Sequence, residues 1–429
     1  MPYDITPGVP MRIAVIGAGI SGMGAAYRLG ADHPVTLFEA EPRLGGHART
    51  VVAGKRGDQP VDTGFIVFNY ATYPLLTKLF AELDVPIAKS NMTFAASIDG
   101  GRVEYALSNL NALFAQRMNA LSPGFLRMLR DIMRFNARAE ALAQDETMTI
   151  RQLLRALGTG ARFRDHYLLP FSGAIWSTPA RDILDFPAAA LVRFFRNHAL
   201  LGVSGQHQWY TVQGGSIEYV RRLEAAMRAR SVALRTGCPI DRVERSPEGV
   251  RIKPRNGDWE TFDAVIFATH GDDSLAMLGD ADAMERAALC KVKYQPNTAV
   301  LHSDATLMPR RRACWASWNY AETPDGSNAL ALTYWMNSLQ PIPQDDPLFV
   351  TLNSTRAIDP AKVHDTVCFS HPVYDMGMME AQREVAAMNG HRATWFCGAW
   401  MRNGFHEDGL ASAMDVVHGI THRTRVIAA

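Results

Sequence analysis

Residues 12 to 39 constrain the fold more than any other stretch of this chain. An apolar run over 12–16 predicts a buried parallel strand, and the stretch from Ser21 to Leu29 predicts a helix. A second apolar run over 35–38 ends at Glu39. A strand, a glycine-rich turn, a helix and a second strand in this order make a βαβ unit. They predict an α/β fold with a Rossmann-type dinucleotide-binding domain.

Three glycines between the first strand and the helix have the spacing of a diphosphate turn. Gly17 permits the tight turn, Gly19 lets a diphosphate approach the backbone, and Gly22 lets the helix pack on the strand. The free N–H groups at the start of the helix favour an anion. Glu39 follows the glycines by about 20 residues, the reach expected for an acid on an adenosine ribose. An ordinary glycine-rich turn would leave this acid unexplained. The predicted contacts are Gly17, Gly19, Ile20, Ser21, Gly22, Glu39 and Ala40.

A second glycine pair, Gly45-Gly46, follows Glu39 within a few residues and is continued by His47 and Arg49. This segment resembles the flavin amine oxidase and carotenoid (phytoene) desaturase superfamily, where such a pair wraps the diphosphate of FAD. Many amine oxidases have an arginine directly after the pair. Histidine at that place is more similar to the desaturase side. The resemblance implies FAD as the cofactor, with these four residues in contact with it.

Three later segments also resemble this superfamily. At Asp62-Thr63-Gly64-Phe65 an acid-x-Gly step is similar to the loop over the isoalloxazine, although a simple β-turn explains it too. Strands over 232–269, entered through Gly214-Gly215, resemble the second part of the FAD domain. The last segment has a strand ending at Gly398 and a helix that we expect to be capped by Asp408. Relatives usually carry an acid where this chain has Ala399. The contacts implied are Thr63, Gly64, Phe65, Val243, Ala268, Thr269, Gly398, Gly409, Leu410 and Ala411.

The resemblance implies a discontinuous FAD domain over 11–75, 208–275 and 390–426. An α+β substrate domain, amine-oxidase-like, would cover 76–207 and 276–389. The stretch 71–207 reads as helical from its apolar spacing. No second GxGxxG is present, so a separate NAD(P)H domain is not expected. The electron acceptor is then oxygen, another carrier, or none if the reaction is an isomerisation.

Residues 125–138 predict an amphipathic basic helix, with Arg127, Arg130, Arg134 and Arg138 at three- and four-residue spacing. Such a helix can lie on an anionic membrane surface. The alternative is an ordinary surface helix with its apolar face in the core and its arginines in solvent.

Candidate catalytic residues come from the resemblance. Asn297 falls where many amine oxidases carry a lysine that bonds, through water, to flavin N5. In an amine oxidase, Trp400, Phe405 and His406 would line the flavin. Paired strands near 315–336 offer a pocket wall, in which we include Trp315, Trp318, Tyr320, Tyr334 and Trp335. His270, at the end of a strand, we interpret as structural.

The composition of the chain limits the kinds of molecule that it is expected to bind. The chain has 429 residues, 47% apolar residues and a net charge of +1, with no basic excess for nucleic acid. Its five cysteines are scattered and never in CxxC spacing, which indicates a reducing compartment and no metal site. The sequence contains no run of 18 uncharged apolar residues, so we expect no transmembrane helix. We expect a cytoplasmic protein, peripheral on the inner face of the membrane if the basic helix binds lipid. The oligomeric state stays open.

Three functions follow from these patterns. The first is an FAD enzyme that removes hydride from a long apolar chain such as a fatty-acyl group, giving desaturation or a double-bond shift. The chain also resembles a bacterial group of predicted NAD/FAD-binding oxidoreductases thought to act beside enzymes that methylate fatty-acyl chains. The second function is an amine oxidase that uses oxygen. The third is a flavin-binding protein without turnover.

Overall fold

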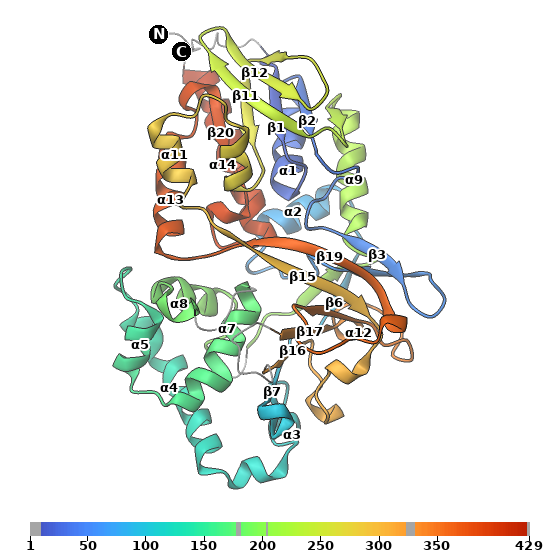
Figure 1. Cartoon of the computed structure of the whole chain (residues 1–429), viewed down its shortest axis with the longest axis vertical. Helices are drawn as coiled ribbons and strands as arrows, with labels where there is room; N and C mark the ends of the chain where they lie inside the picture. The colour runs from blue at the N-terminus through green and yellow to red at the C-terminus, as the bar shows by residue number, and fades with distance from the viewer. Residues whose placement is uncertain (1–9, 177–181, 203–204, 323–330, 427–429) are drawn as a thin grey trace.

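The computed structural model describes residues 10–176, 182–202, 205–322 and 331–426. It has an upper α/β half, which contains the first and the last described residues, and a lower half of helices and a second sheet (Figure 1). The long strands β15 (Tyr294–His302) and β19 (Val363–Pro372) pass between the two halves (Figure 1).

The upper sheet is parallel throughout. Its strand order is β10 (Ala233–Arg235), β2 (Val35–Phe38), β1 (Ile13–Ile16), β14 (Ala264–Phe267) and β20 (Thr394–Phe396). The residues of β1 and β14 are buried and apolar, as expected for central strands covered on both faces. The strands predicted near 12–16, 35–38, 232–235, 263–269 and 393–400 are confirmed, and so is the α/β fold class.

Helices cover this sheet on both faces. They include α1 (Ile20–Leu29), α9 (Ile217–Ala229), α11 (Ala283–Leu289), α13 (Met376–Met388) and α14 (His406–Val426). The α1 and α14 helices pack closely, because a Cβ at Gly24 would lie 2.5 Å from Leu410 Cδ1. An antiparallel meander of β11 (Ile240–Ser246), β12 (Gly249–Pro254) and β13 (Glu260–Phe262) stands beside the sheet, as predicted.

The lower sheet has seven strands, in the order β19, β15, β18 (Phe349–Leu352), β17 (Ala331–Trp335), β16 (Trp318–Ala321), β7 (Phe94–Ile98) and β8 (Val103–Ala106). Three shorter strands make a separate sheet, in the order β5 (Val67–Phe68), β9 (Trp209–Val212) and β6 (Ile87–Ser90). The expectation that 71–207 is helical throughout is therefore wrong at 87–106. The reason is that β6 and β7 pair with β9 and β16, which are distant in sequence.

The remaining helices lie within the stretch 71–207, and the first four of them fall where apolar spacing predicts a helix. They are α2 (Pro74–Glu82), α3 (Leu110–Leu113), α4 (Pro123–Leu142), α5 (Ile150–Leu157), α7 (Leu169–Trp176) and α8 (Ala188–Asn197). The apolar face of α4, from Phe125 to Ala139, is buried in the core, so this face is not available to a bilayer. Shorter elements are the hairpin of β3 (Thr50–Ala53) and β4 (Gln59–Asp62), and the helices α6 (Ala161–Phe163), α10 (Gly271–Met277) and α12 (Met336–Leu339).

The upper sheet takes its five strands from three separate stretches of the chain. They lie within the segments assigned above to an FAD domain, and that division into domains remains our interpretation. Among the described helices, none has the length and apolar content needed to cross a membrane.

Candidate functional site

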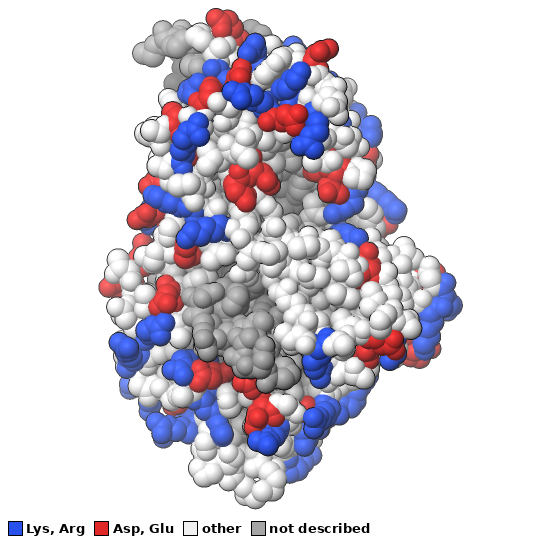
Figure 2. Space-filling model, viewed as in Figure 1, with Lys and Arg blue, Asp and Glu red and all other residues white. Residues whose placement is uncertain are grey.

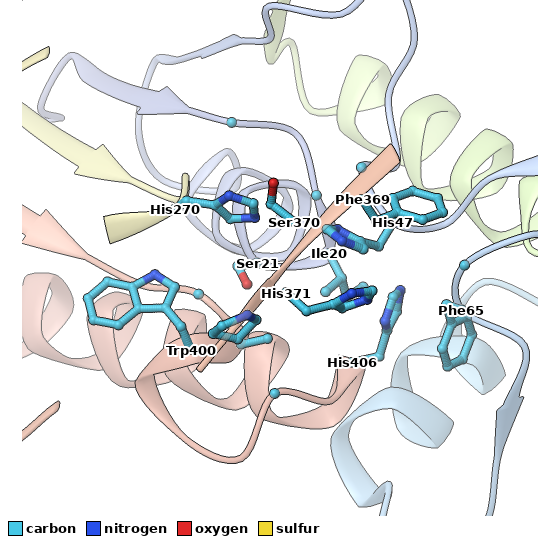
Figure 3. A pocket seen from close by; sticks show the side chains of 18 of the residues that line it. Ile20, Ser21, His47, Phe65, His270, Phe369, Ser370, His371, Trp400 and His406 are labelled. Atoms are coloured by element: carbon cyan, nitrogen blue, oxygen red, sulfur yellow. The ribbon is translucent and has the colours of Figure 1, made fainter. Parts of the chain in front are cut away.

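A cavity of about 800 Å³ lies where the two halves meet. Its upper wall is formed by the carboxyl ends of β1 and β14 and the start of α1, and its other walls by β19 and the start of α14. In open α/β sheets the carboxyl ends of the strands are the usual ligand-binding edge. Figure 3 shows side chains from these separate segments pointing toward one another.

The glycines of the first turn have different structural roles. A Cβ at Gly22 would lie 1.8 Å from the Gly17 carbonyl oxygen, and one at Gly17 would lie 2.8 Å from that of Ala268. These two positions are therefore required by the protein's own packing. At Gly19 no described atom lies within 4 Å of the Cβ position, and Gly19 lines the cavity. The space in front of Gly19 is therefore free for a ligand.

Glu39 holds the first turn and borders the cavity. Its Oε2 accepts a hydrogen bond from the Ala18 backbone N–H at 2.6 Å, and its Oε1 accepts one from Glu41 N–H at 2.9 Å. A carboxylate has about four acceptor sites, so two remain for hydroxyl donors such as those of a ribose.

Most predicted cofactor residues line the cavity. They are Gly17, Gly19, Ile20, Ser21, Glu39, Ala40, Gly45, Gly46, His47, Thr63, Gly64, Phe65, Ala268, Thr269 and Gly398, together with Trp400 and His406 from the catalytic set. The Trp400 indole N–H donates to the Thr269 carbonyl oxygen at 3.2 Å, which holds this ring against the end of β14.

Six predicted contacts do not line the cavity. Arg49 forms an ion pair with Asp365 at 2.6 Å, which ties β3 to β19. Val243 is fully buried on β11, and residues 238–241 line the cavity in its place. Gly409 and Leu410 lie in the packing of α1 and α14. Gly22 packs against Gly17 and Ala268, and Ala411 is buried. Asn297 is also absent from the cavity wall.

The last helix begins two residues before its predicted cap. It starts at His406, and Asp408 lies inside the first turn, where its Oδ2 accepts a hydrogen bond from Phe405 N–H at 3.0 Å. The expectation that Asp408 is the N-cap is therefore wrong. Glu407 accepts hydrogen bonds from the backbone N–H groups of Leu75 and Leu76, both at 2.9 Å, at the start of α2. These acids fix the first turn of α14 and so place His406 in the cavity.

Four histidines surround the central part of the cavity. The ring of His47 stacks on Phe369, and its centroid lies 5.5 Å from that of His371 and 6.1 Å from that of His270. His406 stacks on Phe65 at 3.8 Å, and its Nε2 lies 3.1 Å from the Tyr219 hydroxyl. Burial lowers the pKa of His371 to about 4 and that of His406 to about 3, and it lowers the pKa values of His47 and His270 as well. All four rings are neutral at pH 7.

A chain of hydrogen bonds fixes which nitrogen of His371 carries the proton. Thr298 N–H donates to Asn353 Oδ1 at 2.9 Å, so the other amide atom, Asn353 Nδ2, donates to Asn297 Oδ1. Asn297 Nδ2 must then donate to His371 Nδ1, 2.8 Å away. The neutral ring therefore carries its proton on Nε2. Among the described residues we find no partner for this N–H. Asn297 is a positioning residue for His371, and His371 is the one that reaches the cavity.

Charged side chains are confined to part of the cavity wall. Among its described residues, only Glu39, Asp241, Asp273 and Arg255 are aspartate, glutamate, lysine or arginine. Arg255 and Asp241 pair with each other at 2.9 Å, beside the second strand of the βαβ unit. The remaining wall is aromatic, aliphatic or neutral polar. It includes Trp318 and Tyr334, as predicted, whereas Trp315, Tyr320 and Trp335 lie outside it.

Local sequence patterns did not reveal several wall residues. His371 and Phe369 come from β19, which was not predicted as a strand and reaches the cavity by pairing with β15. His198, directly after α8, and Tyr294, at the start of β15, were not predicted either. His270, interpreted above as structural, also lines the cavity, and its ring stacks on that of Tyr294 at 4.1 Å.

Buried imidazoles make the stability of the fold pH-dependent. The pKa values of His198, His302 and His371 are lowered to about 4, and that of His406 to about 3, each chiefly by burial. A depressed folded-state pKa means that the unfolded chain binds more protons between pH 6.5 and 4. The folded state is therefore stabilised relative to the unfolded chain at pH 7, and this stabilisation is lost as the pH falls below 6.5. Burial raises the pKa of Asp62 to about 6, which acts in the opposite direction over the same range.

Taken together, the unfolded chain binds about three more protons than the folded chain in this range. The free energy of unfolding should therefore fall by roughly 4 kcal/mol as the pH is lowered from 6 to 5. Urea unfolding at several pH values measures this slope. His302 lies outside the cavity, so His302→Gln should reduce the slope by about one proton. A free energy of unfolding that does not change over this range would contradict the assignment.

Comparison with known proteins agrees with this geometry. The model of the family "flavin containing amine oxidoreductase" matches residues 20–346. The chain belongs to this family. Membership implies a flavin cofactor, and it makes this protein a flavin-dependent oxidoreductase. The resemblance noted in the sequence is thereby confirmed at the level of the family.

Curated relatives of this flavin amine oxidoreductase match it only locally. An L-amino-acid oxidase of Sistrurus catenatus edwardsii is 55% identical over 42 residues, which is 10% of this chain and 8% of that protein. An L-amino-acid oxidase of Vipera ammodytes ammodytes is 51% identical over 49 residues, 11% of this chain and 10% of that protein. The matches thus span about a tenth of those relatives.

Solved structures match the flavin amine oxidoreductase over nearly its whole length. A CLA-producing fatty acid isomerase from P. acnes has a TM-score of 0.66 at 15% identity, over 95% of this chain and 98% of that one. A putrescine oxidase variant has a TM-score of 0.71 at 13% identity, over 97% and 100%. A UDP-galactopyranose mutase has a TM-score of 0.69 at 14% identity, over 97% of each. These similarities show a shared fold.

Proposed function

We propose that this protein is an FAD-dependent oxidoreductase that acts on a long apolar chain, as in a fatty-acyl lipid, and either desaturates it or shifts a double bond. The observation that carries this proposal is the uncharged wall of the cavity beyond Glu39, the Asp241–Arg255 pair and Asp273.

The residues present fit FAD. The free space in front of Gly19 and the start of α1 would accept the diphosphate, and Glu39 retains acceptor sites for ribose hydroxyls. Residues 238–241 would border the adenine, and Gly46, Gly64 and His406 the flavin ring. Bound FAD would supply the hydride acceptor. We expect acid or heat to release FAD rather than FMN from the yellow protein. A colourless protein with affinity for NADH would contradict this assignment.

The uncharged wall favours a neutral apolar substrate. A buried carboxylate or ammonium is costly without a counter-charge or several hydrogen bonds. At the histidine end of the cavity, the described wall offers no arginine for an α-carboxylate, and its one carboxylate is that of Asp273, 3.9 Å from His270 Nδ1. It offers apolar side chains such as Val67, Met92, Phe194 and Leu352. An acyl chain fits this wall, and a charged head group would have to remain outside it.

The protein's own groups support the removal of hydrogen. Desaturation takes a hydride from one carbon and a proton from its neighbour, whereas a double-bond shift returns the hydride. The His371 Nε2–H is a fixed donor. The neutral rings of His47, His270 and His406 each have one unprotonated nitrogen, whose proton affinity is lowered by burial. In the desaturation, oxygen or another carrier must reoxidise the flavin. The shift needs no external acceptor.

Mass spectrometry of a lipid extract incubated with the enzyme tests this function. Loss of two hydrogens indicates desaturation, and an unchanged mass with a moved double bond indicates isomerisation. Hydrogen peroxide released from a panel of amines, with no change in the lipids, would instead support an amine oxidase. Bound flavin with no turnover of either class would leave a flavin-binding protein without catalysis.

A further inference from the structure

The lower end of the molecule exposes apolar side chains. Of the twelve large apolar side chains exposed among the described residues, seven lie between residues 107 and 142. Leu110 is 75% exposed, Leu121 74%, Met118 68% and Met133 65%. We define the apolar tip by six residues in the loop before α3, in α3, in the turn η2 (Arg117–Leu121) and on the outer face of α4: Leu107, Leu110, Met118, Leu121, Leu126 and Met133.

The protein holds this tip in a fixed shape with its polar groups turned inward. Asn119 is only 5% exposed, and its Nδ2 donates to the Glu104 carbonyl oxygen at 3.2 Å. The Gln116 side chain bonds both Arg102 O and Glu104 N. Ser122 caps α4 by accepting a hydrogen bond from Phe125 N–H. In this segment polar amide side chains are turned toward the protein and apolar side chains toward solvent, the reverse of the usual arrangement in a globular protein. An exposed apolar patch of this kind marks an interaction surface.

Charge around the tip has one sign. Between residues 105 and 130 there are three arginines and no acid. Arg117, Arg127, Arg130 and Arg138 are exposed, and within the described chain only Arg130 has an acid within 4 Å, at 3.9 Å. Figure 2 shows the white lower end bordered by blue atoms. Arg134 differs, because it donates to the carbonyl oxygens of Leu157 and Gly158 at the end of α5. It belongs to the fold and not to the charged border.

We propose that the apolar tip inserts among the lipids of an anionic membrane while Arg117, Arg127, Arg130 and Arg138 contact the lipid phosphates. Apolar side chains at the centre and exposed cations at the border match the two layers of an anionic bilayer surface. A symmetric contact with a second copy would bring like charges together. This proposal rests on the proposed function, since it explains how a lipid substrate is reached. It differs from the prediction above in that α3, η2 and the outer face of α4 make the contact, and the buried face of α4 does not.

Sedimentation with vesicles tests the membrane contact without any turnover. The flavin-loaded full chain should bind vesicles of phosphatidylcholine with about 30% phosphatidylglycerol more tightly than pure phosphatidylcholine vesicles, and 0.5 M NaCl should weaken binding. The variant Leu110→Ser, Met118→Ser, Leu121→Ser should lose at least about tenfold in affinity. The variant Arg127→Gln, Arg130→Gln, Arg138→Gln should lose about 100-fold, roughly fivefold per arginine.

Matched variants far from the tip control for general surface effects. Val52, Met284 and Met376 are also exposed, and changing these three to Ser should leave vesicle binding unchanged. Flavin content should stay normal in every variant, because none of these residues lines the cavity. Equal binding by wild type and both tip variants would overturn the proposal. So would a wild-type dimer that the tip variants dissociate, which would make this face an interface between copies. Vesicle binding without any lipid turnover would contradict the proposed function and leave the membrane contact standing.

Discussion

Gly19→Val is expected to give a soluble, folded protein that is purified without flavin. The backbone at Gly19 has a φ of −72°, which any residue adopts, and no described atom lies within 4 Å of its Cβ position. Valine therefore meets nothing in the protein, but its methyl groups enter the space where the diphosphate must approach the backbone. The ratio of flavin absorbance to protein absorbance should fall to less than about one-tenth of the wild-type value. Thermal unfolding of the apoproteins should be nearly unchanged.

Gly22→Val is the matched control, because it makes the same substitution three residues later. Its Cβ would lie 1.8 Å from the Gly17 carbonyl oxygen, so this variant should lose the fold itself. The two variants separate a glycine needed by the ligand from one needed by the protein. Normal flavin content in Gly19→Val would show that the diphosphate binds elsewhere.

Asn297→Asp is expected to reduce turnover strongly while flavin stays bound. One carboxylate oxygen can still accept the Asn353 hydrogen bond, but the other would face the unprotonated Nδ1 of His371. The imidazole must then place a proton on Nδ1, and its pKa, now held near 4 by burial, should rise. The Nε2–H donor is lost in the new neutral form. Removal of a fixed donor from an active site costs roughly 100-fold in kcat.

The pH profile separates this effect from simple damage. Because a carboxylate would now support the imidazolium, the profile of kcat should show an ionisation that is absent from wild type. Asn319→Asp is the control: it also buries an acid in the lower sheet, but away from the cavity. That variant should lower stability and leave the pH profile unchanged. Wild-type turnover and profile in Asn297→Asp would show that His371 does not act through its Nε2–H.

The sequence predicted the upper half well because its signals are local. The turn at Gly17 and Gly19, the helix after it and Glu39 all fall within one βαβ unit, and the structure brings them to one edge of the sheet. Steric requirements at Gly17 and Gly22 depend on neighbours in the same unit or on β14 beside it. Such steric requirements fix the spacing of the glycines, and this spacing can be recognised in the sequence.

The lower half was harder to predict because its strands pair with strands that are distant in the sequence. β7 becomes a strand beside β16, more than 200 residues later, and β19 reaches the cavity through its ladder with β15. Nothing near His371 marks it, since its importance comes from a ring nitrogen held by Asn297 across two strands. Asn297 itself was chosen by resemblance, and the structure places it one step behind the cavity. The ion pair of Arg49 could not be predicted either, because its partner Asp365 lies far along the chain.

The interleaved order of the upper sheet constrains how the protein is made. The site needs β1 and α1 from the first part of the chain, β14 from the middle, and β20 with the start of α14 from the last part. During synthesis, the anion site at the Gly19 turn stays uncovered until the ribosome has added the residues up to and beyond His406. The cofactor can therefore be enclosed only after translation of the site is complete. Flavin supply should then affect the yield of mature enzyme at that late step, rather than the folding of the first βαβ unit.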